Sequence, residues 1–168
     1  MATSKALMIH ESDITFLDTG GTVAFTCTSL ATATGRQSAQ HDFGDAATTP
    51  RPYEYTATGF VKFSTDPVVG ETIDVYAKTS DGTHIDNDDG TGDIAVSSVD
   101  KLKNLEYLFS ITVDEISQTV EFTKSMRIRL PRRYFNVVFW NATADTLSST
   151  AADCGFKLTP VVIQGQAT

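Results

Sequence analysis

Positive charge, cysteine and long apolar runs are scarce in this sequence of 168 residues, and each scarcity excludes something. Thirteen Lys and Arg stand against 21 Asp and Glu, which gives a net charge of −8. Binding to nucleic acid or to anionic lipid requires clustered positive charge, so we expect neither nucleic acid nor membrane as a partner. The longest apolar runs, such as residues 137–140, have the length of a strand and are too short to span a bilayer.

Cysteine is limited to Cys27 and Cys154, and without a C-x-x-C pair the sequence carries no metal or redox signature. A disulfide between the two would close a very long loop and stabilise the fold. The alternative is a pair of buried free thiols. Residues 6–9 are too short an apolar stretch for a secretory signal, so we expect folding in a reducing cytosol, which favours the thiols.

Motifs of catalysis are also lacking. His10, His41 and His84 lie in segments expected to be flexible, and although His41 and Asp42 resemble half of a catalytic triad, no serine stands in a nucleophile-elbow sequence. There is no Gly-rich phosphate loop, and no two carboxylates can be assigned the separation that a glycosidase needs. We therefore expect a protein that is not an enzyme and that has no cofactor and no metal.

What the sequence does contain is alternation of apolar and polar residues with a period of two, the pattern of strands with one buried face. Strands are expected at residues 22–28, 53–63, 72–77, 105–113, 120–122, 126–130, 133–141 and 156–163. Residues 133–141 are apolar at both parities, which favours an inter-sheet core around Trp140 over a carbohydrate platform. Helical periodicity is limited to residues 98–108, where a strand from Leu105 competes with it.

Strands without intervening helices predict an all-β fold, an antiparallel β-sandwich that is jelly-roll-like with eight or nine strands. One domain is expected, with residues 1–34 as an N-terminal strand and candidate arm and residues 35–168 as the remainder of the sandwich. Residues 32–52 and 79–92 are expected to be among the least ordered parts. The first of these is long for a passive connection, so it is interpreted as an arm that contacts a neighbour or as a lid.

Acidic residues are concentrated in the loop of residues 81–93, which holds five Asp. Their oxygens could bind calcium, but the spacing does not match an EF-hand, and Asp-Gly pairs are typical of plain turns. A solvated loop and a loop that contacts another subunit are the other interpretations. As candidate contacts we single out Asp86, Asp88 and Asp89.

Basic residues are concentrated between Lys124 and Arg133. In a strand with Met126, Ile128 and Leu130 on its apolar face, Arg127 and Arg129 lie on the opposite face. Such a row is either a solvated charged face or a partner for carboxylates, which guanidinium groups bind bidentately. The candidate interface arginines, which would meet the acidic loop of an adjacent copy or another acidic surface, are Arg36, Arg127, Arg129, Arg132 and Arg133.

Several segments together, in their order along residues 35–162, carry a resemblance to a known family. They are Gly35-Arg36-Gln37-Ser38-Ala39, Asp42-Phe43-Gly44, Tyr53-Glu54-Tyr55, residues 67–76, the loop 80–92, the L-x-x-L stretch Leu102–Leu105 and the strand Arg133–Asn141. In this order the chain resembles small β-sandwich structural proteins of tailed-bacteriophage virions. The resemblance implies a non-enzymatic protein that is made in the host cytoplasm and resides in the virion.

The function expected from this resemblance is that of a capsid decoration, or cement, protein. Its partners would be the major capsid protein and other virion subunits, and a homotrimer is expected. A tail or neck component, including a receptor-binding module at the tail tip, is the alternative. A hydrolase acting on cell-wall glycan is a third hypothesis, which no motif supports.

Overall fold

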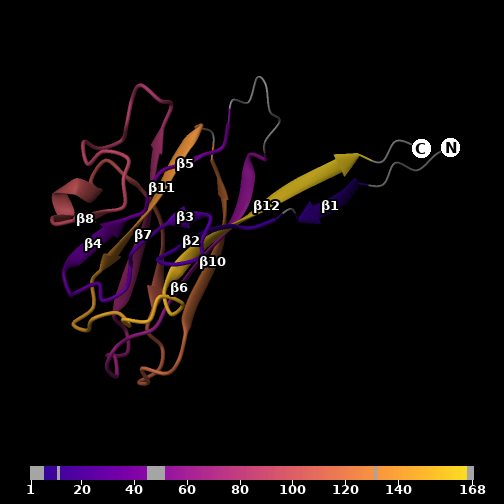
Figure 1. Ribbon diagram of the computed structural model, residues 1–168. Coiled ribbons are helices and arrows are strands. Elements are labelled where there is room, and N and C mark those ends of the chain that lie inside the picture. Colours follow the sequence, from indigo (N-terminus) through magenta and orange to yellow (C-terminus); the bar gives the residue numbers. More distant parts are fainter. Residues whose placement is uncertain (1–5, 11, 45–51, 131, 166–168) are drawn as a thin grey trace.

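Two β-sheets packed face to face make up the fold of the computed structural model (Figure 1), which describes residues 6–10, 12–44, 52–130 and 132–165. The described residues form twelve strands and one short 3-10 helix, η1 (Val99–Leu102). All strand pairs are antiparallel except the pair formed by β2 and β3. The predicted all-β sandwich is thereby confirmed.

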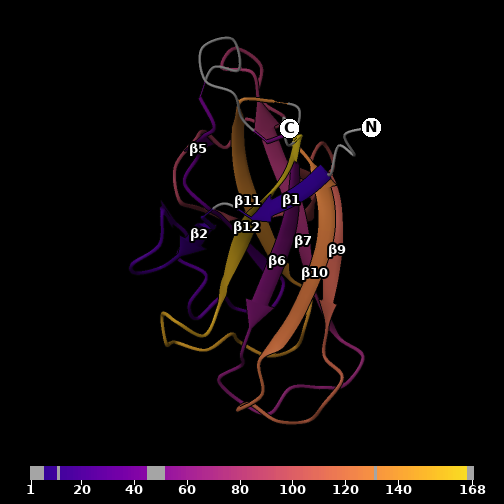
Figure 2. The same ribbon diagram turned by 90° about the vertical axis from the view of Figure 1, so that its right-hand side faces the viewer.

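Sheet A has the order β10-β6-β12-β2-β3, and β1 pairs with the far end of β12 (Figure 2). Its strands are β1 (Ala6–His10), β2 (Ile14–Leu17), β3 (Val23–Ala24), β6 (Glu54–Val61), β10 (Phe122–Arg129) and β12 (Gly155–Gly165). Sheet B has the order β8-β4-β11-β7-β9, and β5 pairs with β11. Its strands are β4 (Thr34–Gln37), β5 (His41–Asp42), β7 (Thr72–Ser80), β8 (Ile94–Val96), β9 (Glu106–Thr112) and β11 (Tyr134–Asn141).

Each sheet has four main strands, and the four additional strands β1, β3, β5 and β8 have only two to five residues each. These short elements account for the difference between twelve strands and the predicted eight or nine. Between residues 22 and 28, where one strand was predicted, only Val23 and Ala24 form one. The jelly-roll connectivity stays a prediction, and so does the division at residue 34.

Alternation in the sequence gives the buried faces of the strands, with exceptions that have physical causes. In β6, every second residue from Tyr55 to Val61 is buried, as predicted. In β9, Tyr107 was expected on the buried face but is exposed, because the pairing with β7 shifts register between Val75 and Tyr76. A bulge of this kind reverses the inward and outward parity of the residues beyond it.

The core between the sheets is built around aromatic rings. Phe156 of β12 lies 5.6 Å from Phe16, 6.0 Å from Phe135 and 6.4 Å from Phe139, measured between ring centroids. Most of these pairs meet edge to face, the geometry that aromatic quadrupoles favour. Because Phe135 and Phe139 belong to β11 of sheet B, these contacts join the two sheets.

A second, smaller apolar cluster lies on the outer face of sheet B. It contains Val96, Leu102, Leu105, Val138 and Trp140. Trp140 was expected in the inter-sheet core, and this placement corrects that expectation: the segment with β8 and η1 folds over β11 and covers the indole. Residues 133–141 are apolar at both parities because both faces of β11 are covered.

Both cysteines are buried free thiols, which was the favoured interpretation of the sequence. Burial raises the pKa of the Cys27 thiol well above its usual value, and a hydrogen bond with Cys154 raises it further. We expect neither thiol to react with a disulfide reagent such as DTNB in the native protein, and both to react after denaturation. Rapid modification of one thiol in the native protein, with the fold intact by circular dichroism, would contradict this burial.

Candidate functional site

The predicted arginine row lies on the outer face of sheet A, at its β10 edge. Side chains of Arg127 and Arg129 are 53% and 80% exposed, on the face opposite Ile128, as the alternation predicted. Met126, predicted on the apolar face with Ile128, is instead exposed, because β10 is the edge strand of its sheet. Both guanidinium groups pair with one carboxylate, Glu54 of β6, at 3.1 and 2.8 Å. Two cations share one anion here, so the edge keeps a surplus of positive charge.

The other two arginines of this group sit beside the start of β11. Arg132 pairs with Asp86 at 2.7 Å, and Arg133 binds both oxygens of Asp42 at 2.7 Å. The guanidinium of Arg133 holds the pKa of the Asp42 carboxyl down at about 2. A two-bond, charge-assisted contact of this kind fixes the orientation of both side chains.

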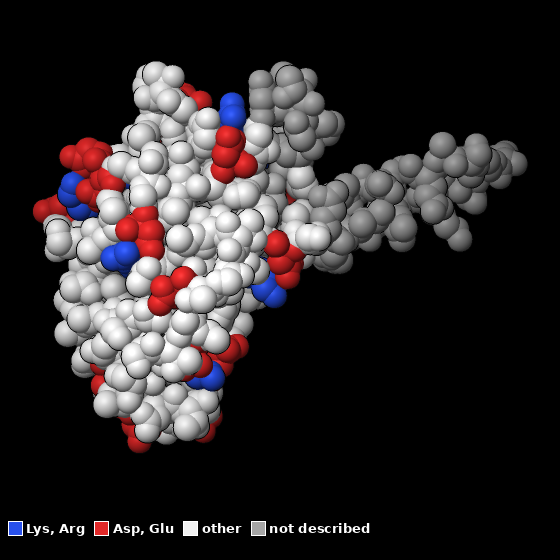
Figure 3. Space-filling view, viewed as in Figure 1, with Lys and Arg blue, Asp and Glu red and all other residues white. Residues whose placement is uncertain are grey.

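All the singled-out acidic residues have partners within the chain. Asp86 also accepts hydrogen bonds from the backbone N–H and the hydroxyl of Thr79. Asp88 and Asp89 both pair with Lys101, each at 2.7 Å, and these contacts raise the pKa of that ammonium group. Figure 3 shows the same pattern, since on this face most blue atoms lie beside red ones.

These contacts bear on two expectations. The candidate arginines were expected to meet the acidic loop of an adjacent copy or another acidic surface, and this stays a prediction; within the chain, Arg132 pairs with Asp86. Arg36 was expected in a loosely ordered arm, but it lies in β4 and pairs with Asp93 at 2.6 Å. Residues 45–51, the part of the expected arm that follows Gly44, lie outside the described residues. A role of the eight residues at a protein interface stays a prediction.

The acidic loop is anchored by a buried lysine that was not singled out from the sequence. The ammonium group of Lys78 donates to the side-chain oxygen of Gln37 at 2.8 Å and to the carbonyl of Gly90 at 2.5 Å. Burial lowers the pKa of Lys78, while the charges of Asp89, Asp86 and Asp88 act in the opposite direction. The loop was expected to be poorly ordered, but these bonds tie it to sheet B.

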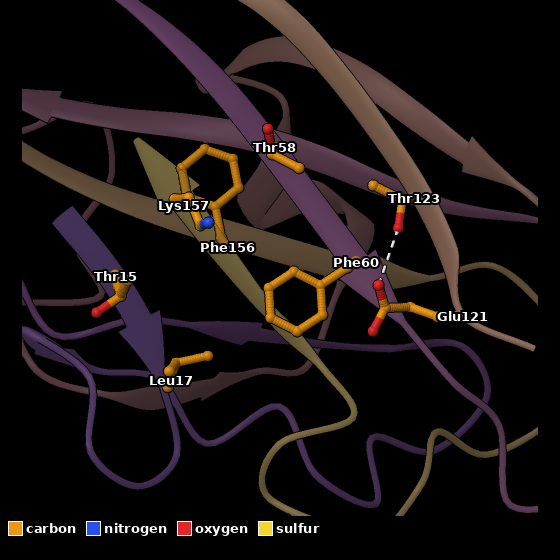
Figure 4. Close-up of a pocket in the computed structure, with 8 residues that line it drawn as sticks. All are labelled: Thr15, Leu17, Thr58, Phe60, Glu121, Thr123, Phe156 and Lys157. Carbon is orange, nitrogen blue, oxygen red and sulfur yellow. Dashed lines mark hydrogen bonds between the residues drawn. The ribbon is translucent and has the colours of Figure 1, made fainter. Parts of the chain in front are cut away.

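A shallow groove lies on the outer face of sheet A, and Figure 4 shows the side chains that line it. Its volume is about 280 Å³, and it crosses strands β2, β12 and β6 toward β10. The lining residues are Thr15, Leu17, Thr58, Phe60, Glu121, Thr123, Phe156 and Lys157. It combines one half-buried aromatic ring with hydroxyl groups, a carboxylate and an ammonium group, and therefore suits a polar ligand that also has an apolar face.

This groove was not predicted from the sequence. The available signal was a single aromatic residue, Phe60, at the outward parity of a strand whose other outward positions are Glu54, Thr56 and Thr58. An aromatic residue at an outward position among threonines differs from a core residue. The sequence alone does not show which strands lie beside Phe60, because the residues paired with it come from distant parts of the chain.

Other kinds of site find no support in the part of the chain that is described. Among these residues, no group of three or more His, Cys, Asp or Glu side chains is arranged to hold a metal ion. No helix within them is long and apolar enough to cross a membrane. The arginine edge, the acidic loop and the groove are the described surfaces considered further.

Replacing Arg133 with Met should raise the pKa of Asp42 from about 2 toward its ordinary value of 3.8. A carboxyl whose pKa is depressed in the folded state stabilises that state above pH 4, and this contribution disappears as the pH falls from 4 to 2. Because the pair is well exposed, the loss of stability at neutral pH should stay below about 1 kcal/mol. Carboxyl NMR titration measures the pKa, with Arg127→Met as a control that should leave Asp42 unchanged.

Comparison with known proteins does not assign this chain to a family. No protein-family model matches the sequence. A search of curated proteins found no match either.

Proposed function

We propose that this chain is a structural protein of a bacteriophage particle, a capsid decoration protein that binds the major-capsid lattice and stabilises it. The observation that carries this proposal is the ribbon formed by β1 and the end of β12. Figure 1 shows it projecting away from the body of the sandwich. The proposal includes no catalytic step.

The ribbon has the backbone features of a docking element. Residues 6–10 pair with residues 161–165, whereas the described pairing of β12 with β6 ends at Val161. Among the described strands, β1 pairs with β12 alone. A two-stranded ribbon is marginally stable in water by itself, and an unpaired strand edge is a template for another chain. Contact with a neighbouring subunit supplies the stabilisation and the strand-edge pairing that this two-stranded ribbon lacks by itself.

The order of the eight main strands supports the proposal. Numbered one to eight along the chain, the strands β2, β4, β6, β7, β9, β10, β11 and β12 pair as first with eighth, second with seventh, third with sixth and fourth with fifth. We infer that this is a jelly roll, because a long hairpin wrapped around a core pairs its strands in this way. Jelly rolls recur in viral capsid proteins and also in lectins, so the fold supports a virion role by analogy alone.

Stabilisation of a lattice follows from mass action. A protein that binds assembled capsid subunits, and not the free ones, shifts the equilibrium toward the assembled state. A trimer would bind one particle through several arms, and the second contact on the same particle is effectively intramolecular. The surplus positive charge around Arg127 and Arg129 gives a partner carboxylate a place to bind beside Glu54.

Copy number in purified particles tests the location. We expect quantitative mass spectrometry to give near parity with the major capsid protein, or a simple fraction of it. A count of a few copies to a few dozen would move the protein to the tail or neck. Absence from the particle would overturn the virion proposal altogether.

A truncated chain that lacks residues 1–10 tests the role of the ribbon. It should fold with a melting temperature near that of the full chain. In a co-sedimentation assay, it should lose most of its binding to particles from which this protein has been removed. The matched variant Arg127→Met/Arg129→Met keeps the ribbon, so it should still bind, with binding less sensitive to added salt. Undiminished binding by the folded truncated chain would mean that the ribbon is not the docking element.

A further inference from the structure

The ring of Phe60 lies flat on the outer face of sheet A, and a glycine makes this possible. Gly155 of β12 pairs with Phe60 of β6. A Cβ atom at Gly155 would lie 2.8 Å from Cζ of Phe60 and 2.5 Å from Cδ2 of Leu17. Both contacts are too short for any side chain, so only glycine lets the two neighbours lie over this strand. The end of the ring thus lies close over the glycine, and the ring is half-buried in the groove (Figure 4 shows it among the other lining side chains).

Hydroxyl groups surround this ring in register across the sheet. Thr123 of β10 pairs with Phe60, and the next outward row contains Thr15, Lys157, Thr58 and Ser125 on four adjacent strands. The hydroxyls of Thr58 and Ser125 lie 2.8 Å apart. A threonine or serine hydroxyl both donates and accepts, so each can bind a hydroxyl group of a ligand.

Opposite charges stand at the two sides of the groove. Glu121, at the β10 side, is exposed and accepts a hydrogen bond of 3.3 Å from the hydroxyl of Thr123. Lys157, on β12, pairs with Asp13 at 3.1 Å and keeps 41% of its side chain exposed. A carboxylate accepts from hydroxyl groups and an ammonium group donates to ether or hydroxyl oxygens, so the rim offers both kinds of contact.

We propose that this groove binds a carbohydrate, a short stretch of β-linked pyranose rings, with one ring stacked on Phe60. A pyranose with equatorial hydroxyls has an apolar C–H face, which suits the accessible part of the half-buried Phe60 ring, and a polar edge, which suits the surrounding hydroxyls. Glu121 and Lys157 orient the chain through its outer hydroxyl groups. This inference goes beyond the structural role proposed above and applies equally to a capsid or a tail position.

The shape and charge of the groove distinguish this ligand from others. It is shallow and near the lower end of the volumes of ligand pockets, so it holds one or two sugar rings and not a buried cofactor. Its one ammonium group is offset by one carboxylate, which disfavours a nucleic acid. Its apolar lining consists of Phe60, Leu17 and Phe156, and the last of these is fully buried, which leaves too little apolar surface to hold a lipid chain.

Titration of the ¹⁵N-labelled full chain with cellotetraose, and separately with chitotetraose, tests the inference by NMR. We expect backbone signals around Phe60, Thr123 and Lys157 to shift with at least one of the two, at concentrations up to about 10 mM. The variant Phe60→Ala should weaken binding at least about tenfold, because it removes the stacking surface. Phe60→Trp should retain binding, which separates loss of the platform from a disturbed sheet.

A matched control is Tyr107→Ala, which removes an aromatic side chain that is 54% exposed on the other sheet and should leave binding unchanged. Absence of any shift with both sugars would overturn the inference, as would equal binding by a folded Phe60→Ala variant. If Phe60→Ala instead dissociates an oligomer of the free protein in sedimentation velocity, this face is an interface between copies and the inference is wrong. None of these outcomes bears on particle copy number.

Discussion

The contacts of Phe156 with Phe16, Phe135 and Phe139 are the interaction on which the rest of the structure depends. They join β12 and β2 of sheet A to β11 of sheet B. These interdigitating ring contacts fix the position of one sheet relative to the other. The preceding residue, Gly155, faces the opposite way because successive residues in a strand point to opposite faces. One dipeptide therefore fixes the core on its inner side and opens a place for Phe60 on its outer side.

The two outer faces of the sandwich differ in what covers them. On sheet B, the chain between β7 and β9 folds back, buries Lys78 under the loop carbonyls and covers Trp140 with an apolar cluster. On sheet A, the corresponding face carries a half-buried ring among hydroxyl groups and an arginine edge. The chain itself therefore covers much of the outer face of sheet B, whereas the outer face of sheet A is not covered in this way.

Charge pairing within the chain explains how an acidic protein keeps an ordered acidic loop. Each of Asp86, Asp88 and Asp89 has a cation at 2.7 Å, from Arg132 or from Lys101. Exposed pairs of this kind contribute little individually, but here they also position a loop whose backbone carbonyls bind buried polar groups such as Lys78. The acidic loop thus mainly covers sheet B, and its solvent-facing side is the part of it that another molecule can reach.

The sequence by itself determined the class of fold, the buried parity of β6 and β7, the double-sided burial of β11 and the outward direction of Arg127 and Arg129. Period-two alternation encodes these features locally, because it depends only on which side of one strand meets the core. Tertiary structure alone decided the bulge that exposes Tyr107, the cover over Trp140, the partners of the arginines and the groove around Phe60. Each of these depends on residues that are distant in sequence and become neighbours through strand pairing, which no local pattern specifies.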